Sequence, residues 1–198
     1  MRMKLCVFQG TFNPIHNAHL RVGEYVCQKF KFDKILYIPA FIPPHKTCDI
    51  NMAQHRLNMV KLATQSNKMF DVSDIEYHRQ EKSYTLVTIQ ELYRQYSVDG
   101  KINFIIGTDA FEKIESWYKT EQLKDLVKFI VFIREENFVQ AKYNYLKDKG
   151  YDFEFQSLPY KDISSTELRE MIKNGEDISA LIPKEVKDYI EENELYKN

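Results

Sequence analysis

Hydrophobic and polar positions along this chain form short apolar runs separated by longer helical patterns. Five runs rich in β-branched and aromatic residues predict strands. They lie at residues 3–8 (MKLCVF), 34–39 (KILYIP), 102–107 (INFIIG), 128–133 (KFIVFI) and 152–156 (DFEFQ). The third and fourth runs are apolar enough to be buried on both faces, which is typical of strands covered by helices on both sides.

Between these runs, apolar residues recur three and four positions apart, as they do on one face of a helix. Such patterns span residues 20–30, 57–63 and 86–96. Strands that alternate with helices predict right-handed crossovers and a parallel sheet with helices on both faces. The residues from Ser164 onward predict two short helices separated by Ile182-Pro183. No repeat or Gly/Ser-rich linker divides the chain, so we expect a single α/β domain over residues 1–198.

The charge balance excludes some classes of partner. The chain has 28 Lys and Arg against 29 Asp and Glu, which argues against a general affinity for nucleic acid or anionic lipid. Its apolar runs are too short for a signal peptide or a membrane span. The three cysteines, Cys6, Cys27 and Cys48, form no CxxC pair and predict neither a disulfide framework nor a zinc knuckle. We therefore expect a cytoplasmic protein, bound to neither nucleic acid nor membrane, that holds any anion at a local site.

One candidate for such a site is the stretch GTFNPIHNAH at residues 10–19. We expect the first strand to end near Phe8, residues 9–14 to form a loop, and a helix to begin near His16. Backbone N–H groups and the positive end of the helix dipole meet at such a point and favour an anion. Gly10 would let the backbone approach a ligand, and His16 and His19 would share a face of the first helical turn.

An isolated HxxH pair has plainer interpretations. His16 could cap the helix while His19 is an ordinary surface histidine. Zinc is disfavoured, because the spacing is not HExxH, no cysteine pair is near, and the other histidines, His45, His55 and His78, are dispersed. Neither GxxxxGK[ST] nor GxGxxG occurs, which argues against a P-loop and a standard dinucleotide-binding fold.

Two motifs together resemble the signatures of the nucleotidyltransferase superfamily. GTFNPIHNAHL resembles G[ST]FDPIHxGHL, and ISSTELR at 163–169 resembles ISSTx[IL]R. Further segments resemble bacterial nicotinate-nucleotide adenylyltransferases: IPPHK at 42–46, SDIE at 73–76, SYT at 83–85, FIIGTDAF at 104–111, Trp117-Tyr118 and the ending IPKEVKDYIEENELY. The resemblance covers essentially the whole chain and implies a single-domain Rossmann-like nucleotidyltransferase fold. Asn13 and Ala18 stand where that family usually has Asp and Gly.

The resemblance implies transfer of AMP from ATP to nicotinate mononucleotide, with release of pyrophosphate, to give the dinucleotide precursor of NAD. The attacking phosphate is already an anion, so the enzyme must hold it in line and neutralise charge, and needs no general base. ATP and nicotinate mononucleotide are the implied partners. A magnesium ion would bridge the phosphates, held mostly by substrate oxygens and water, and no protein ligand to it is expected. The sequence leaves the oligomeric state open, and a homo-oligomer is compatible with it.

The same resemblance implies three groups of site residues. The catalytic group, which binds the ATP phosphates and the transition state, consists of His16, His19 and Arg169. Further ATP-binding residues are Gly10, Thr11, Phe12, Lys46, Gly107, Asp109, Arg134, Ile163, Ser165 and Thr166. The substrate group consists of Thr85, Trp117 and Tyr118, with Trp117 stacked on the pyridine ring and backbone N–H groups near the other two holding the carboxylate.

Structural alternatives stand beside several of these roles. Arg169 and Lys46 could be solvated, Asp109 could cap a helix, and Trp117 could belong to the core. The rival functions are adenylyl transfer to nicotinamide mononucleotide or phosphopantetheine, cytidylyl transfer, and nucleotide binding without turnover. The SYT and WY segments favour a pyridine substrate over phosphopantetheine or cytidylyl transfer. The two histidines with Arg169 argue against a non-catalytic protein.

Overall fold

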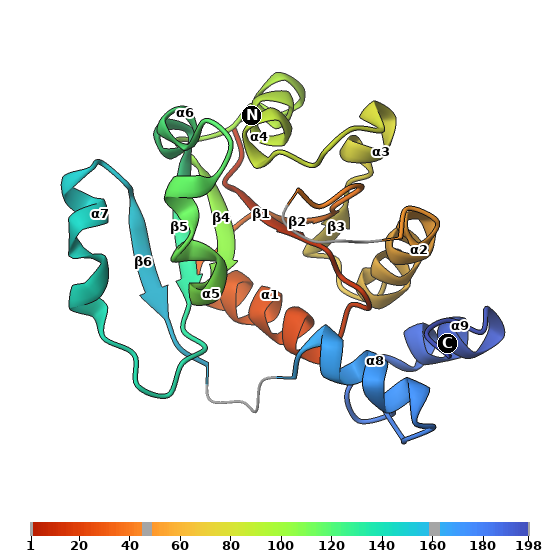
Figure 1. The fold of residues 1–198 in the computed structure, drawn as a ribbon. Coiled ribbons are helices and arrows are strands. Elements are labelled where there is room, and N and C mark those ends of the chain that lie inside the picture. The colour runs from red at the N-terminus through yellow and green to blue at the C-terminus, as the bar shows by residue number, and fades with distance from the viewer. Residues whose placement is uncertain (1, 45–48, 159–162, 198) are drawn as a thin grey trace.

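The computed structural model describes residues 2–44, 49–158 and 163–197. Over these residues the chain forms one six-stranded, parallel sheet with the order β3-β2-β1-β4-β5-β6 (Figure 1). The strands are β1 (Leu5–Gly10), β2 (Lys34–Pro39), β3 (Phe70–Val72), β4 (Ile102–Gly107), β5 (Val127–Phe132) and β6 (Phe153–Gln156). The order reverses between β1 and β4, and a crevice for ligands is expected at the carboxyl ends of these two strands.

Helices cover both faces of the sheet, as the alternating pattern predicted. They are α1 (Asn17–Phe30), α2 (Met52–Thr64), α3 (Ile75–Arg79), α4 (Thr85–Gln95), α5 (Thr108–Phe111), α6 (Thr120–Leu126), α7 (Asn144–Asp148), α8 (Ser165–Lys173) and α9 (Lys184–Glu192), with 3₁₀ helices η1 (Ile114–Ser116) and η2 (Gln140–Tyr143). The core on one face is shared with α1, α2, α8 and α9, and the core on the other with α3 to α7. Figure 1 shows α8 beside the start of α1.

Side chains of the central strands alternate between these two cores. In β4, Phe104 and Ile106 pack on the side of α4 to α6, whereas Ile105 packs on the side of α1. In β5, Phe129 packs on the side of α4 to α6 and Ile130 on the side of α1. Both faces are buried, so these strands need apolar residues at successive positions, and the expectation drawn from their continuous apolar runs is confirmed.

Two strand assignments from the sequence were wrong. The first strand ends at Gly10 rather than near Phe8, because Gln9 and Gly10 continue the parallel pairing with β2 although neither is apolar. The expected loop at residues 9–14 therefore begins two residues later. The strand β3 was not predicted, because it has only three residues and of these only Phe70 is buried, too few to produce a period of two.

The two C-terminal helices are confirmed, and contacts tie this segment to the rest of the molecule. The hydroxyl of Tyr189 on α9 lies 2.9 Å from His55 Nδ1 and accepts a hydrogen bond from Asn58 Nδ2 at 2.9 Å, both on α2. Further along, the hydroxyl of Tyr196 donates to Asn13 Oδ1 at 2.6 Å. The last residues of the chain therefore hold the loop that follows β1.

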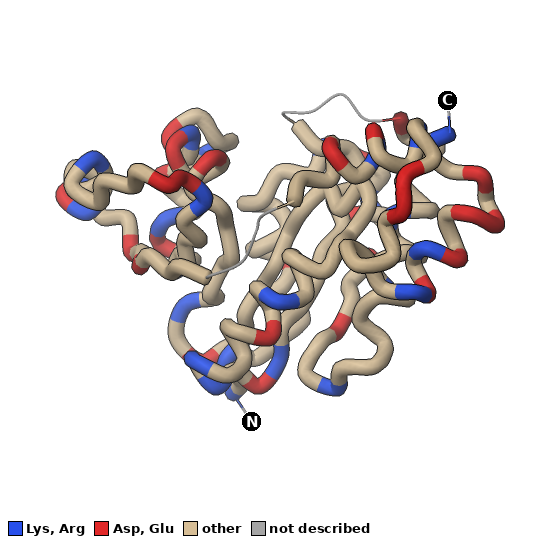
Figure 2. Tube along the Cα trace, turned by 90° about the horizontal axis from the view of Figure 1, so that it is seen from below, with Lys and Arg blue, Asp and Glu red and all other residues tan. Residues whose placement is uncertain are grey.

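Charged side chains lie mainly on the outer helices. Figure 2 shows Lys and Arg interspersed with Asp and Glu along these helices. Such a mixture produces little long-range field of either sign, so an anion must be bound by local groups. In the described ranges, no helix combines the length and the apolar character that crossing a membrane would require.

A buried cation joins the ends of β1 and β2. Arg56 on α2 is fully buried, and its guanidinium donates to the carbonyl oxygens of Thr11 at 3.0 Å, Phe41 at 2.9 Å and Ala40. The N–H of Phe41 in turn donates to the carboxylate of Glu76, which is also fully buried, at 3.2 Å. A single guanidinium therefore fixes the loop after β1 against the loop after β2.

We expect Arg56→Met to lower the free energy of unfolding by about 3 kcal/mol or more, because three buried carbonyls lose a charged donor. Arg56→Lys should recover only part of this loss, since an ammonium lacks the planar fork of donors. Urea unfolding measures both changes. The exposed Arg94→Met is the matched control and should change stability by about 0.5 kcal/mol at most. An Arg56→Met protein as stable as the wild type would show that the guanidinium does not hold the loops.

Candidate active site

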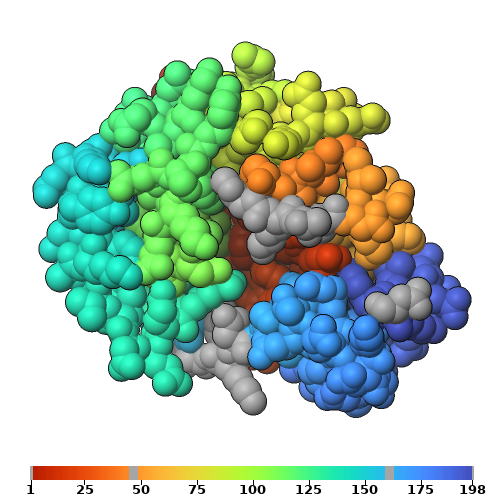
Figure 3. Space-filling model, in the orientation of Figure 1, coloured from red at the N-terminus to blue at the C-terminus, as the bar shows by residue number. Residues whose placement is uncertain are grey.

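A cavity of about 790 Å³ lies at the carboxyl ends of β1 and β4. Figure 3 shows the hollow, with the start of the chain in red on its floor and green and blue segments around it. Its volume is in the range typical of small-molecule sites. The following expected site residues line it: Gly10, Thr11, Phe12, His16, His19, Thr85, Gly107, Asp109, Trp117, Tyr118, Arg134, Ile163, Ser165, Thr166 and Arg169. Lys46 lies outside the described residues.

The loop after β1 turns sharply into the cavity wall. Phe12 adopts a left-handed backbone conformation, with φ at 47°, and buries its ring almost completely. A Cβ on Gly10 would lie 3.0 Å from that ring, so a glycine at this position makes room for Phe12. Since the side chain of Phe12 is buried, its backbone is the part available to a ligand.

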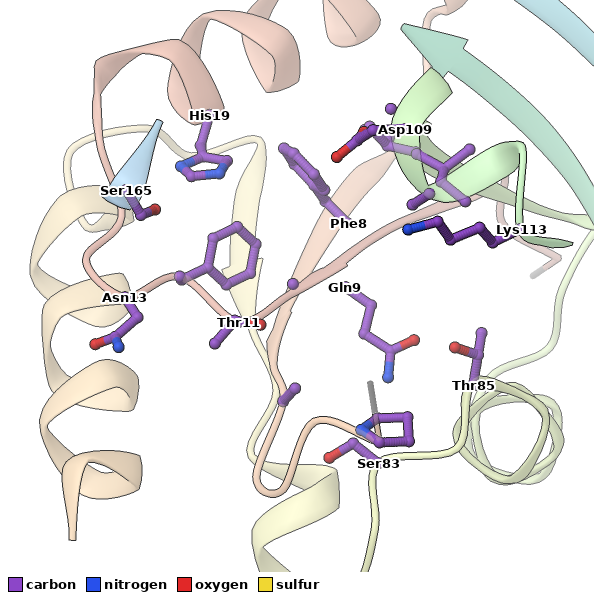
Figure 4. Close-up of a pocket in the computed structure, with 18 of the residues that line it drawn as sticks. Phe8, Gln9, Thr11, Asn13, His19, Ser83, Thr85, Asp109, Lys113 and Ser165 are labelled. Atoms are coloured by element: carbon purple, nitrogen blue, oxygen red, sulfur yellow. The ribbon is translucent and has the colours of Figure 1, made fainter. Parts of the chain in front are cut away.

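His19 is held by packing and by one hydrogen bond. Its ring stands edge-on to the rings of Phe8 and Phe12, with centroids at 5.8 and 5.0 Å. The backbone N–H of His16 donates to His19 Nδ1 at 3.3 Å. In the neutral ring this assigns the remaining proton to Nε2. Figure 4 shows the ring beside Phe8 and Ser165 at the edge of the cavity.

His16 is the N-cap residue of α1 and is only 2% exposed. Its ring lies against that of His19, with centroids 3.7 Å apart, and its Nδ1 is buried with no hydrogen-bond partner among the described residues. Burial, and secondly the charge of Arg134, lower the pKa of His16 to about 4. The ring is therefore neutral at physiological pH and offers a donor and an acceptor, but no charge.

The second signature forms the start of α8. Ser164 is its N-cap: Ser164 Oγ accepts from the N–H of Glu167 at 3.1 Å, and the N–H of Ser164 donates to Glu167 Oε2 at 2.8 Å. Ser165 Oγ donates to the carbonyl oxygen of Pro14 at 3.0 Å. The capping box fixes the helix start, and Ser165 docks it on the first signature.

Arg169 also reaches the first signature. It donates to the carbonyl oxygen of Asn13 at 2.9 Å and to that of Ser165 at 3.1 Å. The guanidinium therefore lies beside the loop after β1, at the cavity, and is not a freely solvated side chain. The side chain of Asn13 keeps an acceptor where the family usually has Asp, and Tyr196 uses that acceptor.

The opposite wall follows β4. Gly107 is the N-cap of α5, so the expected alternative that Asp109 caps this helix is wrong. Asp109 Oδ2 lies 3.7 Å from Arg134 Nη1, and both side chains are exposed. A Cβ on Gly107 would lie 2.6 Å from Asp109 Oδ1 and 3.0 Å from Arg134 Nε. Glycine at 107 therefore allows the two charged side chains to meet over the end of the strand.

One end of the cavity is aromatic. Trp117 is partly buried and stands edge-on to Phe104, with centroids 6.2 Å apart, while also lining the cavity. The rings of Tyr118 and Tyr84 stack with centroids 4.5 Å apart. α4 begins at Thr85, whose N–H therefore has no acceptor within the helix. This end suits a flat ring that carries an acceptor group.

Several further residues that line the cavity had no role assigned from the sequence, among them Gln9, Ser83 and Lys113. Figure 4 shows Gln9 and Lys113 pointing into the space between β1 and the start of α4. Ser83 lies in the SYT segment, which could have indicated it. No sequence signal marks Gln9 or Lys113, because the direction of each side chain depends on where its strand or turn ends.

Comparisons with known proteins agree with this geometry. Residues 7–171 match the model of a family described as cytidylyltransferase-like. The nicotinate-nucleotide adenylyltransferase of Bacillus subtilis is 38% identical over 196 residues, covering 98% of this chain and 99% of that protein. A relative from Dictyoglomus thermophilum is 37% identical over 195 residues, covering 98% and 100%.

Among solved structures, a Plasmodium falciparum nicotinic acid mononucleotide adenylyltransferase complexed with NaAD has a TM-score of 0.77. Its sequence identity is 24%, and the match covers 97% of this chain and 96% of that one. At this identity the likeness concerns the fold. Because the curated relatives are more than a third identical over almost their whole length, this chain belongs to the nicotinate-nucleotide adenylyltransferase family.

Proposed function

We propose that this enzyme transfers AMP from ATP to the phosphate of nicotinate mononucleotide, giving nicotinate adenine dinucleotide and pyrophosphate in NAD biosynthesis. One observation carries the proposal: both family signatures meet at a cavity with one end formed by histidine, arginine and backbone N–H groups and one aromatic end. His16, His19 and Arg169 lie at the first end, and Trp117 and Thr85 at the second. The curated relatives support the choice of reaction.

In this reaction an oxygen of the mononucleotide phosphate attacks the α-phosphorus of ATP, and the bond to the oxygen bridging to the β-phosphate breaks. No proton has to be removed from the attacking group. His19 would donate through Nε2–H, and neutral His16 would act as a second donor to the phosphates. Arg169 would supply positive charge, and the backbone N–H groups of Thr11 and Phe12 would hold phosphate oxygens in line.

Residues in the other walls of the cavity would make the remaining contacts to ATP. The exposed carboxylate of Asp109 would accept from the ribose hydroxyls, with Gly107 and Arg134 beside it. The start of α8, where Ile163, Ser165 and Thr166 line the cavity, would hold phosphate oxygens on its unpaired N–H groups. We also assign a phosphate contact to Lys46, on the family resemblance alone.

Magnesium enters this proposal as part of the substrate. Among the described residues, no group of three or more His, Cys, Asp or Glu side chains is placed to hold a metal ion. A magnesium ion bound to the triphosphate, with phosphate oxygens and water as most of its ligands, fits such a site. When bound, it would neutralise charge on the departing pyrophosphate.

The function is tested by steady-state assay of pyrophosphate release with ATP and a panel of acceptors. The panel contains nicotinate mononucleotide, nicotinamide mononucleotide and phosphopantetheine, and CTP replaces ATP in one arm. We expect kcat/KM for the acid to exceed that for the amide by roughly two orders of magnitude. A carboxylate can accept from both of the backbone N–H donors near Thr85 and Tyr118, whereas the NH₂ group of an amide is itself a donor and leaves one of them unpaired. Each buried donor left unpaired costs about 1–3 kcal/mol of binding free energy.

Trp117→Ala should weaken both pyridine substrates, since lost stacking costs roughly 1–3 kcal/mol by analogy with base stacking, while the preference for the acid persists. Equal efficiencies for acid and amide in the wild type would favour a dual-specificity or nicotinamide enzyme. Faster turnover with phosphopantetheine or CTP would replace the proposed substrate altogether.

His19→Ala should lower kcat by about 100-fold or more, because it removes a fixed donor at the reacting phosphates. Circular dichroism and the urea midpoint check that the variant is folded. His78→Ala, which alters an exposed histidine on α3, is the control and should retain wild-type kcat. Near-normal turnover in a folded His19→Ala protein would remove His19 from the catalytic group.

The lowered pKa of His16 predicts a pH effect on stability. Unfolding would raise the pKa of His16 from about 4 to its ordinary 6.5, so below pH 6.5 the unfolded state binds the proton that the native state excludes. Stability should therefore fall as pH drops from about 6.5 to 4, by about 3 kcal/mol from this residue. His16→Asn should lose that part of the pH dependence in urea unfolding at several pH values. An unchanged dependence in His16→Asn would mean that His16 is not held neutral.

A further inference from the structure

An unsatisfied acceptor lies at the floor of the cavity. The side chain of Gln9, at the end of β1, points toward Ser83 and Thr85 (Figure 4). Its Nε2 donates to Glu76 Oε1 at 2.5 Å, whereas its Oε1 is buried and has no hydrogen-bond partner among the described residues. A buried acceptor without a donor costs free energy. Because Gln9 lines the cavity, a small shift of its amide when a ligand binds would bring Oε1 to a donor on that ligand.

The orientation of the Gln9 amide is fixed by Glu76. This fully buried carboxylate also accepts from the hydroxyl of Thr88 at 2.6 Å and from the N–H of Phe41 at 3.2 Å, and it lies 3.8 Å from the guanidinium of Arg79. If the amide were turned over, its oxygen would face a carboxylate oxygen at 2.5 Å. Nε2 must therefore face Glu76, which leaves Oε1 for a ligand.

The side of the sheet on which the Gln9 side chain lies indicates which of the two substrates it is near. Gln9 is two residues after Val7 and lies on the same face, toward α3 and α4, whereas Phe8 packs on the opposite face with His19. Gln9 is therefore at the end of the cavity where the proposed function places the mononucleotide. The carboxylate and phosphate of the acid can only accept at neutral pH. Its ribose hydroxyls are the groups that can donate.

We propose that Gln9 is a further substrate-binding residue, whose Oε1 accepts a hydrogen bond from a ribose hydroxyl of nicotinate mononucleotide. Glu76 is the positioning residue that aims this oxygen. The proposal rests on the proposed function, and it adds selection for a ribose over a deoxyribose acceptor. The contact acts on binding of the mononucleotide, since the hydroxyls take no part in the bond that forms or the bond that breaks.

The first test compares Gln9→Met with Thr88→Val. Gln9→Met keeps the length of the side chain and removes both amide groups, while Thr88→Val removes another donor to the same Glu76 oxygen without touching the cavity. We expect KM for nicotinate mononucleotide to rise about 3- to 10-fold in Gln9→Met, with kcat and KM for ATP nearly unchanged. Thr88→Val should keep the wild-type KM. No rise in Gln9→Met, or an equal rise in both variants, would overturn a direct contact.

The second test removes the hydroxyl from the substrate. The wild type is assayed with 2′-deoxy and 3′-deoxy nicotinate mononucleotide, and the analogue that lacks the donating hydroxyl should lose about tenfold in kcat/KM. Gln9→Met should be insensitive to the same deletion. A wild type that uses both analogues as well as the parent nucleotide would overturn the inference, as would a Gln9→Met protein that loses activity with nicotinamide mononucleotide alone.

Different results would refute the proposed function and the ribose contact of Gln9. A wild type that does not adenylylate nicotinate mononucleotide refutes the proposed function, and the ribose contact with it. A wild type that turns over the acid while Gln9→Met behaves in the same way with every analogue refutes the contact alone.

Discussion

The guanidinium of Arg56 holds the carbonyl oxygens of Thr11, Ala40 and Phe41 together, and the geometry of the site starts from that contact. Parallel strands leave their carboxyl ends without a connecting turn, so the loops after β1 and β2 need an external restraint. A fully buried cation that donates to carbonyls in both loops provides one. The N–H of Phe41 donates to Glu76, and Glu76 also accepts from Gln9 at the floor of the cavity. The same set of contacts therefore also positions Gln9.

A second set of contacts, made by the C-terminal segments, holds the loop after β1. The loop after β1 receives Arg169 and Tyr196 at Asn13, and Ser165 at Pro14, so segments from the end of the chain close on its beginning. These contacts fix the positions of Arg169 and Ser165 relative to the loop after β1. Catalysis that depends on charge stabilisation benefits from donors that need not reorganise.

The sequence predicted most of the fold because burial on two faces leaves a strong pattern. The continuous apolar run at residues 102–107 strongly predicts a buried strand, and the two signatures predicted a site at the strand end where the cavity lies. The misses have physical causes. β3 is too short to show the two-residue alternation of a strand. Nothing in the sequence distinguishes Arg56 from an exposed arginine on a helix, because its burial depends on the loops after β1 and β2. The direction of Gln9 depended on β1 continuing to Gly10, which only pairing with β2 decides.

The neutral protonation state of His16 is consistent with adenylyl transfer, although a protonated histidine would bring more positive charge to the phosphates. A general base works best with a pKa near the operating pH, and the pKa of His16, lowered to about 4 by burial and by Arg134, is far from it. A reaction whose nucleophile is already ionised has no use for such a base. It needs donors that stay fixed while charge moves from one phosphate to the next. In the proposed function, the buried neutral imidazole of His16, packed against His19, would meet that need, because the ring would donate without adding a charge that burial would penalise.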